Sequence, residues 1–173
     1  MLKRFVPFAH AKSVFEIEVS FYEKLGFKYV FLDLDNTLDS YKTKTPSNNA
    51  KSLKNRLEKA GLKIIITSNN TGKRVEAYAK ALGVDFISSI GKPFAFGLRK
   101  ALKKLNIKQN EVVLIGDQTV TDISSANGAH IKSVLTDKIV DEDQPTTRFN
   151  RLLDRPIRKS LQKHKLLRDW REF

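Results

Sequence analysis

The chain contains no cysteine among its 173 residues, which excludes disulfide bonds and thiolate metal sites. Any metal ion must therefore be held by oxygen or imidazole ligands. Long apolar runs are also absent, because no window approaches the roughly 18 residues that a membrane-spanning helix needs. The first residues show no apolar stretch that ends in a small-residue cleavage site. We therefore expect a protein that is not exported and works in the cytoplasm.

Acidic residues are scarce relative to basic ones. The chain has 32 lysines and arginines against 19 aspartates and glutamates, and its formal net charge is +13. Such an excess favours an anionic partner, which could be a phosphorylated substrate, an anionic membrane surface or, as the less favoured choice, nucleic acid. The excess is concentrated in residues 148–173, where nine basic residues oppose three acidic ones. Composition leaves a homo-oligomer open.

Apolar segments that end in polar residues alternate with helical patterns along the chain. Strands are expected at 29–34, 62–67, 85–89, 111–116 and 131–136, and helices at 13–25, 45–60, 73–82 and 93–105. Strands that alternate with helices are typical of a parallel sheet with helices on both faces. The sequence therefore predicts the α/β class with a mainly parallel central sheet.

The first helix, expected at 13–25, carries more apolar surface than one packing face needs. Ser13 and Glu16 have the spacing of a capping box, and a glycine follows the expected helix end. Phe21 lies on one apolar face of this helix, and Tyr22 lies on a second. One of the two faces can pack on the sheet, and we expect the other to be covered by the carboxyl-terminal segment or, as the alternative, to be exposed and to dock on a membrane or partner.

The pattern indicates one domain at residues 1–147, which includes the first helix. Acids, threonines and a proline replace the periodic pattern at 136–148, so we expect a flexible connection there. The basic residues 148–173 then form a helical segment that packs on this domain or extends from it. Pro156 is expected to break that helix.

Polar side chains stand where several expected strands end. In "VFLDLDNTLDS" the first strand runs into aspartates, and the later exits carry "TSNN" and "GDQ". A carboxylate at the mouth of a buried strand is costly unless a cation pairs with it. Because the carboxyl ends of parallel strands share one edge, we expect these exits to meet in one crevice. The side chains concerned are Asp33, Asp35, Thr67, Ser68, Lys92 and Asp117.

The chemistry that fits this set is phosphoryl transfer to an aspartate. Asp33 would attack phosphorus, while Mg²⁺ bound by hard oxygen ligands would neutralise the phosphate charge. Asp33 and Asp117 are the expected side-chain ligands, the Asp35 carbonyl is a third, and Asp122 could reach a metal-bound water. Asp35 is also placed to protonate the leaving oxygen and later to activate water.

The remaining polar residues would bind the transferring phosphoryl group. Ser68 and Asn69 would donate to its equatorial oxygens, and Lys92 would supply positive charge beside Asp33. Whether Thr67 or Ser68 faces the phosphate is open, and we favour Ser68.

At this point the residues resemble a known family. "DLDNT", the serine after the second apolar run, the lysine of "GKP" and "GDQTVTD" resemble, in order, the four motifs of the haloacid dehalogenase (HAD) phosphatase superfamily. "GKPFAFGLRKAL" and "GDQTVTDISSAN" are similar to the small YqeG-type branch of subfamily IIIA, which is similar to phosphatidylglycerophosphate phosphatases. The resemblance implies a three-layer Rossmann-like HAD fold and Mg²⁺-dependent hydrolysis of phosphomonoesters through a phospho-aspartate. It implies the roles given above for Asp33, Asp35, Ser68, Lys92 and Asp117, and less firmly for Asp122.

The gaps between these motifs are short. Residues 35–68 are filled by a loop, a helix and a strand, and residues 68–92 by a helix and a strand. Neither gap leaves room for a cap domain, so we expect a capless enzyme. An open crevice suits a bulky phosphoester, such as phosphatidylglycerophosphate, or a site covered by a neighbouring subunit.

Two alternatives belong to other functional classes. A phosphorylated signalling receiver needs an acidic pair before its aspartate, and no strand-end pair precedes Asp33. The presence of Asp35 also favours turnover of a phospho-aspartate over its retention. The second alternative is a basic module that binds membrane or RNA, with weak or vestigial phosphatase activity.

Overall fold

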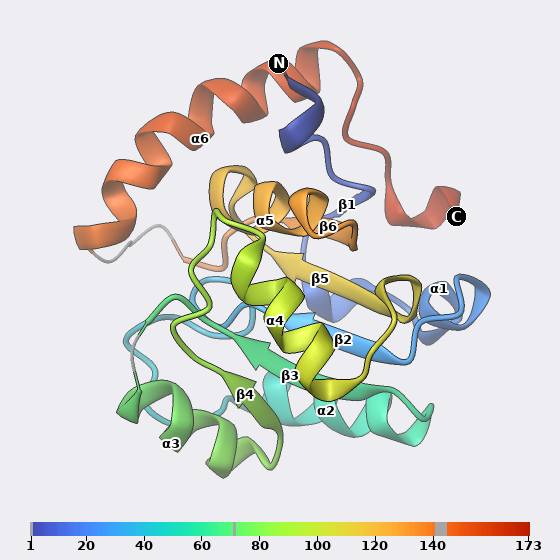
Figure 1. Ribbon diagram of the computed structural model, residues 1–173, viewed down its shortest axis with the longest axis vertical. Helices are drawn as coiled ribbons and strands as arrows, with labels where there is room; N and C mark the ends of the chain where they lie inside the picture. Colours follow the sequence, from blue (N-terminus) through green and yellow to red (C-terminus); the bar gives the residue numbers. More distant parts are fainter. Residues whose placement is uncertain (1, 71, 141–144) are drawn as a thin grey trace.

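The computed structural model describes residues 2–70, 72–140 and 145–173, with 145–151 described by backbone alone. Its centre is one sheet of six parallel strands in the order β1-β6-β5-β2-β3-β4 (Figure 1). The strands are β1 (Ala9–Ala11), β2 (Tyr29–Leu32), β3 (Lys63–Thr67), β4 (Asp85–Ile87), β5 (Val112–Gly116) and β6 (Lys132–Thr136). The α-helices are α1 (Val19–Lys24), α2 (Asn48–Lys59), α3 (Lys73–Leu82), α4 (Phe96–Leu105), α5 (Ser124–Gly128) and α6 (Pro145–Lys163).

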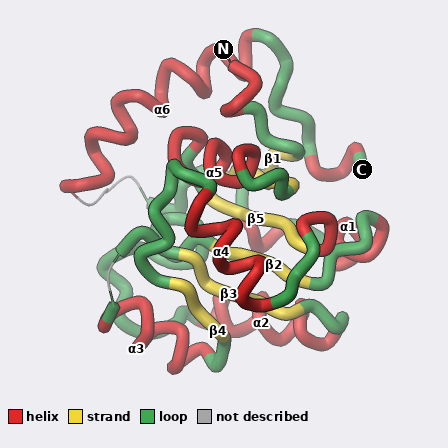
Figure 2. Tube along the Cα trace, viewed as in Figure 1, coloured by secondary structure: helices red, strands yellow, loops and turns green. Residues whose placement is uncertain are grey.

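Helices cover both faces of the sheet, so the α/β prediction and the parallel sheet are confirmed. Successive strand residues point to opposite faces, and in β2 Val30 and Leu32 join one apolar core while Phe31 joins the other. The first core includes residues of α2 and α3, and the second includes residues of α4 and α5. Figure 2 shows α4 in front of the strands and α2 behind them. The result is a three-layer domain.

The first predicted helix, 13–25, is wrong as a single element. The chain forms a 3₁₀ turn at Val14–Glu16 and then α1, because Ile17 between them has an extended backbone with φ −70° and ψ 118°. Ser13 caps the turn by accepting from the Phe15 amide, but the Glu16 carboxylate accepts from the Lys12 amide and so does not close the predicted box.

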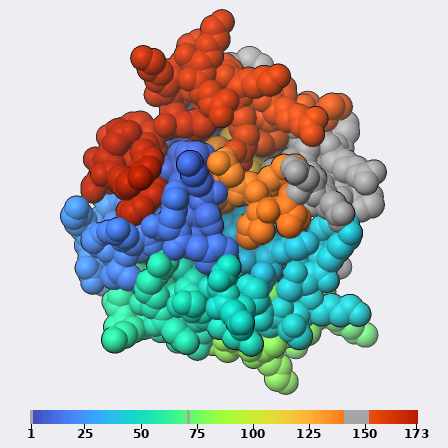
Figure 3. All heavy atoms as spheres, turned by 180° about the vertical axis from the view of Figure 1, so that it is seen from behind, coloured from blue at the N-terminus to red at the C-terminus, as the bar shows by residue number. Residues whose placement is uncertain are grey.

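The break between the 3₁₀ turn and α1 lets both apolar faces be buried. Phe21 and Tyr22 are at most 2% exposed. The carboxyl-terminal segment packs against Phe21 through Trp170 and Phe173, at ring-centroid distances of 6.2 Å and 6.5 Å. Figure 3 shows this segment, in red, against the amino-terminal segment, in blue. The carboxyl-terminal segment therefore covers the face that carries Phe21.

Several element boundaries differ from the prediction. Helix α2 begins at Asn48, where the Ser47 hydroxyl accepts from the Ala50 amide, rather than at the preceding Thr-Pro pair. Helix α4 begins three residues after Pro93, because the chain first makes a turn in which the Phe94 amide donates to the Gly91 carbonyl. Neither β1 nor the π-helical turn Thr119–Ile123 was predicted from the sequence.

Helix α6 runs through Pro156, so the predicted break there is wrong. Side chains on both sides of the proline are held by the domain: Asp154 is 2% exposed and Leu161 is fully buried. These contacts stabilise helical geometry that the missing proline N–H would otherwise weaken. The expected flexible connection falls partly on residues 141–144, which lie outside the described residues.

No helix in the described part of the chain combines the length and the apolarity that a membrane crossing requires.

Candidate active site

Three aspartates meet at the carboxyl-terminal edge of the two central strands. β2 and β5 pair with Leu32 opposite Ile115, and the Asp33 amide donates to the Ile115 carbonyl at 2.9 Å. This register places Asp33 beside Asp117, which follows the end of β5. Asp33, Asp117 and Asp122 each present a carboxylate oxygen, and these oxygens lie within 4.8 Å of one another. We call these residues the acidic trio.

Asp122 reaches the trio because Gly116 has no side chain. A Cβ atom at Gly116 would lie 2.3 Å from the Asp122 carboxyl carbon, closer than real contacts allow. Asp122 lies in the π-helical turn Thr119–Ile123, and its Oδ2 accepts from the Gln118 amide at 3.1 Å. Turns of this kind are frequent at functional sites. The glycine before Asp117 is thus a steric requirement of the site.

Lys92 supplies a cation to the trio in this structure. Its Nζ donates to Asp33 Oδ1 and to Asp122 Oδ1, both at 2.6 Å, and its side chain is 2% exposed. The Lys92 backbone is fixed by the Asn69 side chain, which accepts from the Lys92 amide and donates to its carbonyl, both at 2.7 Å. Sequence reasoning predicted that Lys92 would stand beside Asp33, and the structure places it there.

The site's charges shift the pKa values of its groups in opposing ways. Burial raises the pKa of Asp33 well above its usual value, and the carboxylates of Asp122, Asp117 and Asp35 add to this, while Lys92 opposes it. Burial alone would lower the pKa of Lys92, but the Asp122 and Asp33 carboxylates outweigh it, so the net direction is upward. Lys92 therefore stays protonated, and the trio is short of positive charge.

Asp35 lies next to the trio rather than within it. Its carboxylate accepts from the side-chain nitrogen of Asn70 at 2.8 Å and pairs with an Arg74 guanidinium nitrogen at 2.7 Å. One oxygen is held by each partner, so the carboxylate is fixed in orientation. Sequence reasoning gave no role to Asn70 or Arg74, and a lone arginine near the start of a helix carries no signal that could have identified it.

The polar residues at the end of β3 and just after it make different contacts. The Thr67 hydroxyl donates to the Leu32 carbonyl at 3.4 Å, inside the sheet, which leaves Ser68 as the hydroxyl at the strand exit. Ser68 Oγ accepts from the Asn70 amide at 3.1 Å. Asn69 contacts the backbone of Lys92, as described above. The phosphate-binding roles of Ser68 and Asn69 stay predictions.

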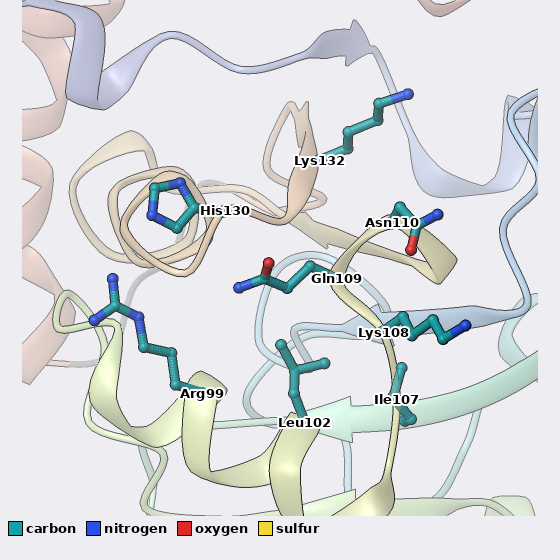
Figure 4. Close-up of a pocket in the computed structure, with 8 residues that line it drawn as sticks. All are labelled: Arg99, Leu102, Ile107, Lys108, Gln109, Asn110, His130 and Lys132. Atoms are coloured by element: carbon teal, nitrogen blue, oxygen red, sulfur yellow. The ribbon is translucent and has the colours of Figure 1, made fainter.

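A separate surface hollow of about 620 Å³ lies away from this edge (Figure 4). Its lining residues come from α4, from the chain that leads into β5, and from the start of β6. Because the strands are parallel, the hollow is at their amino-terminal edge, opposite the acidic trio. Figure 4 shows the ammonium groups of Lys108 and Lys132 turned outward, and none of the described residues that line the hollow carries a carboxylate.

The acidic trio fits a divalent cation of the hard class. Mg²⁺ prefers oxygen ligands and is commonly held by one or two carboxylates together with waters. Three carboxylates so close together repel one another strongly unless positive charge is added, and Lys92 provides only one positive charge. The Thr37 hydroxyl donates to Asp117 Oδ1 at 3.4 Å and so orients one of the carboxylates.

Comparison with known proteins agrees with the motifs. A model of haloacid dehalogenase-like hydrolases matches residues 9–130. The chain is 30% identical to a protein named probable phosphatase YqeG from Bacillus subtilis, over 94% of this chain and 95% of that one.

Solved structures share the fold. An uncharacterised protein from Listeria monocytogenes has a TM-score of 0.53 at 19% identity, over 77% of this chain and 99% of its own. A 3-deoxy-D-manno-octulosonate 8-phosphate phosphatase from Yersinia pestis has a TM-score of 0.50 at 14% identity, over 75% of this chain and 72% of its own. The motifs, the trio's geometry, the matched family model and the relative over nearly the whole chain all lead to one assignment: this chain belongs to the haloacid dehalogenase-like hydrolases.

Proposed function

We propose that the protein is a Mg²⁺-dependent phosphomonoester hydrolase that works through a phospho-aspartate. The observation that carries the proposal is the meeting of Asp33, Asp117 and Asp122 at one strand edge, with Lys92 bonded to two of them. The similarity to a probable phosphatase over nearly the whole chain supports the same reaction class.

In the first step, a carboxylate oxygen of Asp33 forms a bond to phosphorus as the bond from phosphorus to the substrate oxygen breaks. Asp35 gives its proton to that departing oxygen, so an alcohol leaves. In the second step, Asp35 takes a proton from water, the water oxygen bonds to phosphorus, and the bond to Asp33 breaks to release phosphate. Asn70 and Arg74 hold the Asp35 carboxylate in one orientation during both steps.

The other polar residues position the phosphoryl group and the cation. Lys92 stabilises negative charge on Asp33 and on the transferring group. Ser68 is proposed to donate to a phosphoryl oxygen, and Asn69 acts in this scheme mainly by holding the backbone of Lys92. Four groups would hold the cation: the carboxylates of Asp33, Asp117 and Asp122 and the carbonyl of Asp35. The bound cation would neutralise negative charge at the site.

We propose a bulky phosphoester with an apolar portion as the substrate class. The chain between Asp35 and Lys92 is occupied by α2, β3, α3 and β4, and we propose that no cap domain closes the site. Two large apolar side chains follow Lys92 within four residues: Phe94 is 69% exposed and Phe96 is 75% exposed. Together with the net charge of +13, they favour an anionic lipid phosphomonoester such as phosphatidylglycerophosphate.

The test is a panel of phosphomonoesters assayed with Mg²⁺, including phosphatidylglycerophosphate in mixed micelles and glycerol phosphate in solution. Asp33→Asn removes the nucleophile and is expected to lower kcat on the order of 10³-fold or more. Asp85→Asn is the matched control, because Asp85 is exposed at the opposite edge of the sheet. Equal hydrolysis by the wild type and Asp33→Asn would show that the nucleophile is assigned wrongly.

The same panel tests the substrate class and the binding-module alternative. We expect kcat/KM to be higher for the lipid phosphomonoester than for glycerol phosphate. Equal values for both substrates would remove the argument from the two exposed phenylalanines. A wild-type protein that hydrolyses nothing but floats with anionic vesicles, or binds RNA in a salt-dependent way, would favour the binding module.

A further inference from the structure

Helix α6 contacts the loop that carries Asp117 and Asp122, from a part of the chain beyond the residues matched by the family model. The contacts come from two residues one helical turn apart, Asp154 and Arg158. Figure 1 shows α6 lying across one end of the domain. We call Asp154 and Arg158 the α6 clamp.

Asp154 caps the π-helical turn from outside. The residue at the turn's amino-terminal cap, Gln118, makes no side-chain capping bond. In its place Asp154 Oδ1 accepts from the Thr119 amide at 2.6 Å, from the Val120 amide at 3.3 Å and from the Thr119 hydroxyl. A carboxylate at this end satisfies amides that have no partner within the turn. Asp154 therefore fixes the turn that delivers Asp122 to the trio.

Arg158 ties the same loop to the ends of two strands. One of its terminal nitrogens donates to the carbonyl of Asp117 and, at 2.7 Å, to the carbonyl of Thr136 at the end of β6. Its other nitrogens bond to Asp154 Oδ2 at 3.0 Å and to Asp137 Oδ1 at 3.1 Å. Arg158 therefore contacts the Asp117 backbone directly, and Arg158 and Asp154 are also bonded to each other.

We propose that the α6 clamp consists of positioning residues that set the affinity of the acidic trio for its divalent cation. The inference rests on the proposed function, because it concerns the same site. Neither residue touches the reacting atoms. Each acts through the backbone of residues 117–120, on which the directions of the Asp117 and Asp122 carboxylates depend. Partners that orient metal ligands commonly change metal affinity 10- to 100-fold when they are removed.

The experiment measures Mg²⁺ binding by isothermal titration calorimetry on the full chain without substrate. Asp154→Ala and Arg158→Ala are each expected to weaken Mg²⁺ binding roughly 10- to 100-fold. They are also expected to speed amide hydrogen exchange at Thr119 and Val120, the amides that Asp154 accepts from. Arg158→Lys, which keeps the charge but loses the fork of donors, is expected to fall between Arg158→Ala and wild type.

Two controls on the same helix separate positioning from general loss of stability. Arg155→Ala removes the same charge from an exposed position, and Leu161→Ala removes a fully buried side chain. Both are expected to keep the wild-type dissociation constant for Mg²⁺, although Leu161→Ala lowers the melting temperature. If Asp154→Ala fails to fold, Asp154→Asn keeps the side-chain shape while removing its charge, and the same weakening is expected.

Unchanged Mg²⁺ affinity in the clamp variants would overturn the inference, and so would an equal loss of affinity in Leu161→Ala. These outcomes leave the proposed function standing as long as the wild type binds Mg²⁺. A wild-type protein that binds no Mg²⁺ would overturn both together.

Discussion

Replacing Lys92 with methionine tests the electrostatics of the site most directly. The lysine side chain is 2% exposed and donates to two buried carboxylates at 2.6 Å each. Lys92→Met keeps most of the side-chain volume but leaves the acidic trio without its cation. Losing one partner of a buried ion pair costs about 3–5 kcal/mol, because the remaining charge is buried and unpaired.

The same magnitude follows from counting contacts. Each hydrogen bond to a charged group is worth about 1.5–3 kcal/mol, and Lys92 makes two to the trio. In a chain of 173 residues, about 1 kcal/mol shifts the melting temperature by roughly 2–4 °C. We therefore expect Lys92→Met to melt roughly 6–20 °C below the wild type in EDTA. Lys103→Met, at an exposed position on α4, is the matched control and is expected to melt near the wild type.

The pH dependence has a defined sign. Burial raises the pKa of Asp33 in the folded protein, so folding is favoured below the ordinary carboxyl pKa and loses stability as pH rises through the folded-state value. Lys92 opposes this loss of stability at higher pH, so removing Lys92 makes the loss larger. Urea unfolding in EDTA is therefore expected to show a greater deficit for Lys92→Met at neutral pH than at about pH 5.

Added Mg²⁺ is expected to restore much of the stability of Lys92→Met, because a divalent cation replaces the missing positive charge among the carboxylates. Activity is expected to stay low, since the cation does not replace the ammonium beside the transferring group. A variant that unfolds within 1 kcal/mol of the wild type in EDTA, with no dependence on pH or Mg²⁺, would refute this account of the site's charges.

Two further predictions concern the neighbourhood of the trio. Gly116→Ala places a Cβ 2.3 Å from the Asp122 carboxyl carbon, so it is expected to cost about 1–3 kcal/mol in urea unfolding and to weaken Mg²⁺ binding; wild-type values in both would contradict the steric argument. The hydrogen bond from His10, with Arg158 also contributing, lowers the pKa of the half-exposed Asp137. The stabilisation from the Asp137 carboxylate is therefore present above the ordinary carboxyl pKa and is lost as pH falls through the folded-state pKa. The free energy of unfolding of Asp137→Asn is expected to be lower than that of the wild type by less than about 1 kcal/mol at about pH 6, and equal to it in strong acid. A deficit of Asp137→Asn that grew on acidification would show the sign to be wrong.

The sheet and the meeting of the aspartates could be predicted from the sequence because both follow from local patterns. Buried parallel strands are apolar throughout, and an acid that ends such a run marks the strand's carboxyl end. The approach of Asp33 to Asp117 then needs only that their strands be neighbours, which the pairing of β2 with β5 provides.

The features that were missed depend on contacts between distant segments. The residues of β1 read Ala-His-Ala, which has no strand-forming pattern, and they become a strand by pairing with β6 from Ala9 opposite Val134. Asp154 is an acid in a basic segment, which hints at a buried partner, but its bonds to Thr119 arise only when α6 docks. Helix α6 is continuous through Pro156 for the same reason.

In the proposed mechanism, the acidic trio also accounts for the need of both a lysine and a divalent ion in a chain that is otherwise rich in basic residues. The chain has 32 basic and 19 acidic side chains, and this net positive charge attracts a phosphate ester from a distance. At short range, three carboxylates would repel it. One ammonium and one divalent cation together supply three positive charges, which matches the three carboxylates. With a monovalent cation in place of the proposed Mg²⁺, the trio would be one charge too negative at the place proposed for the phosphoryl group.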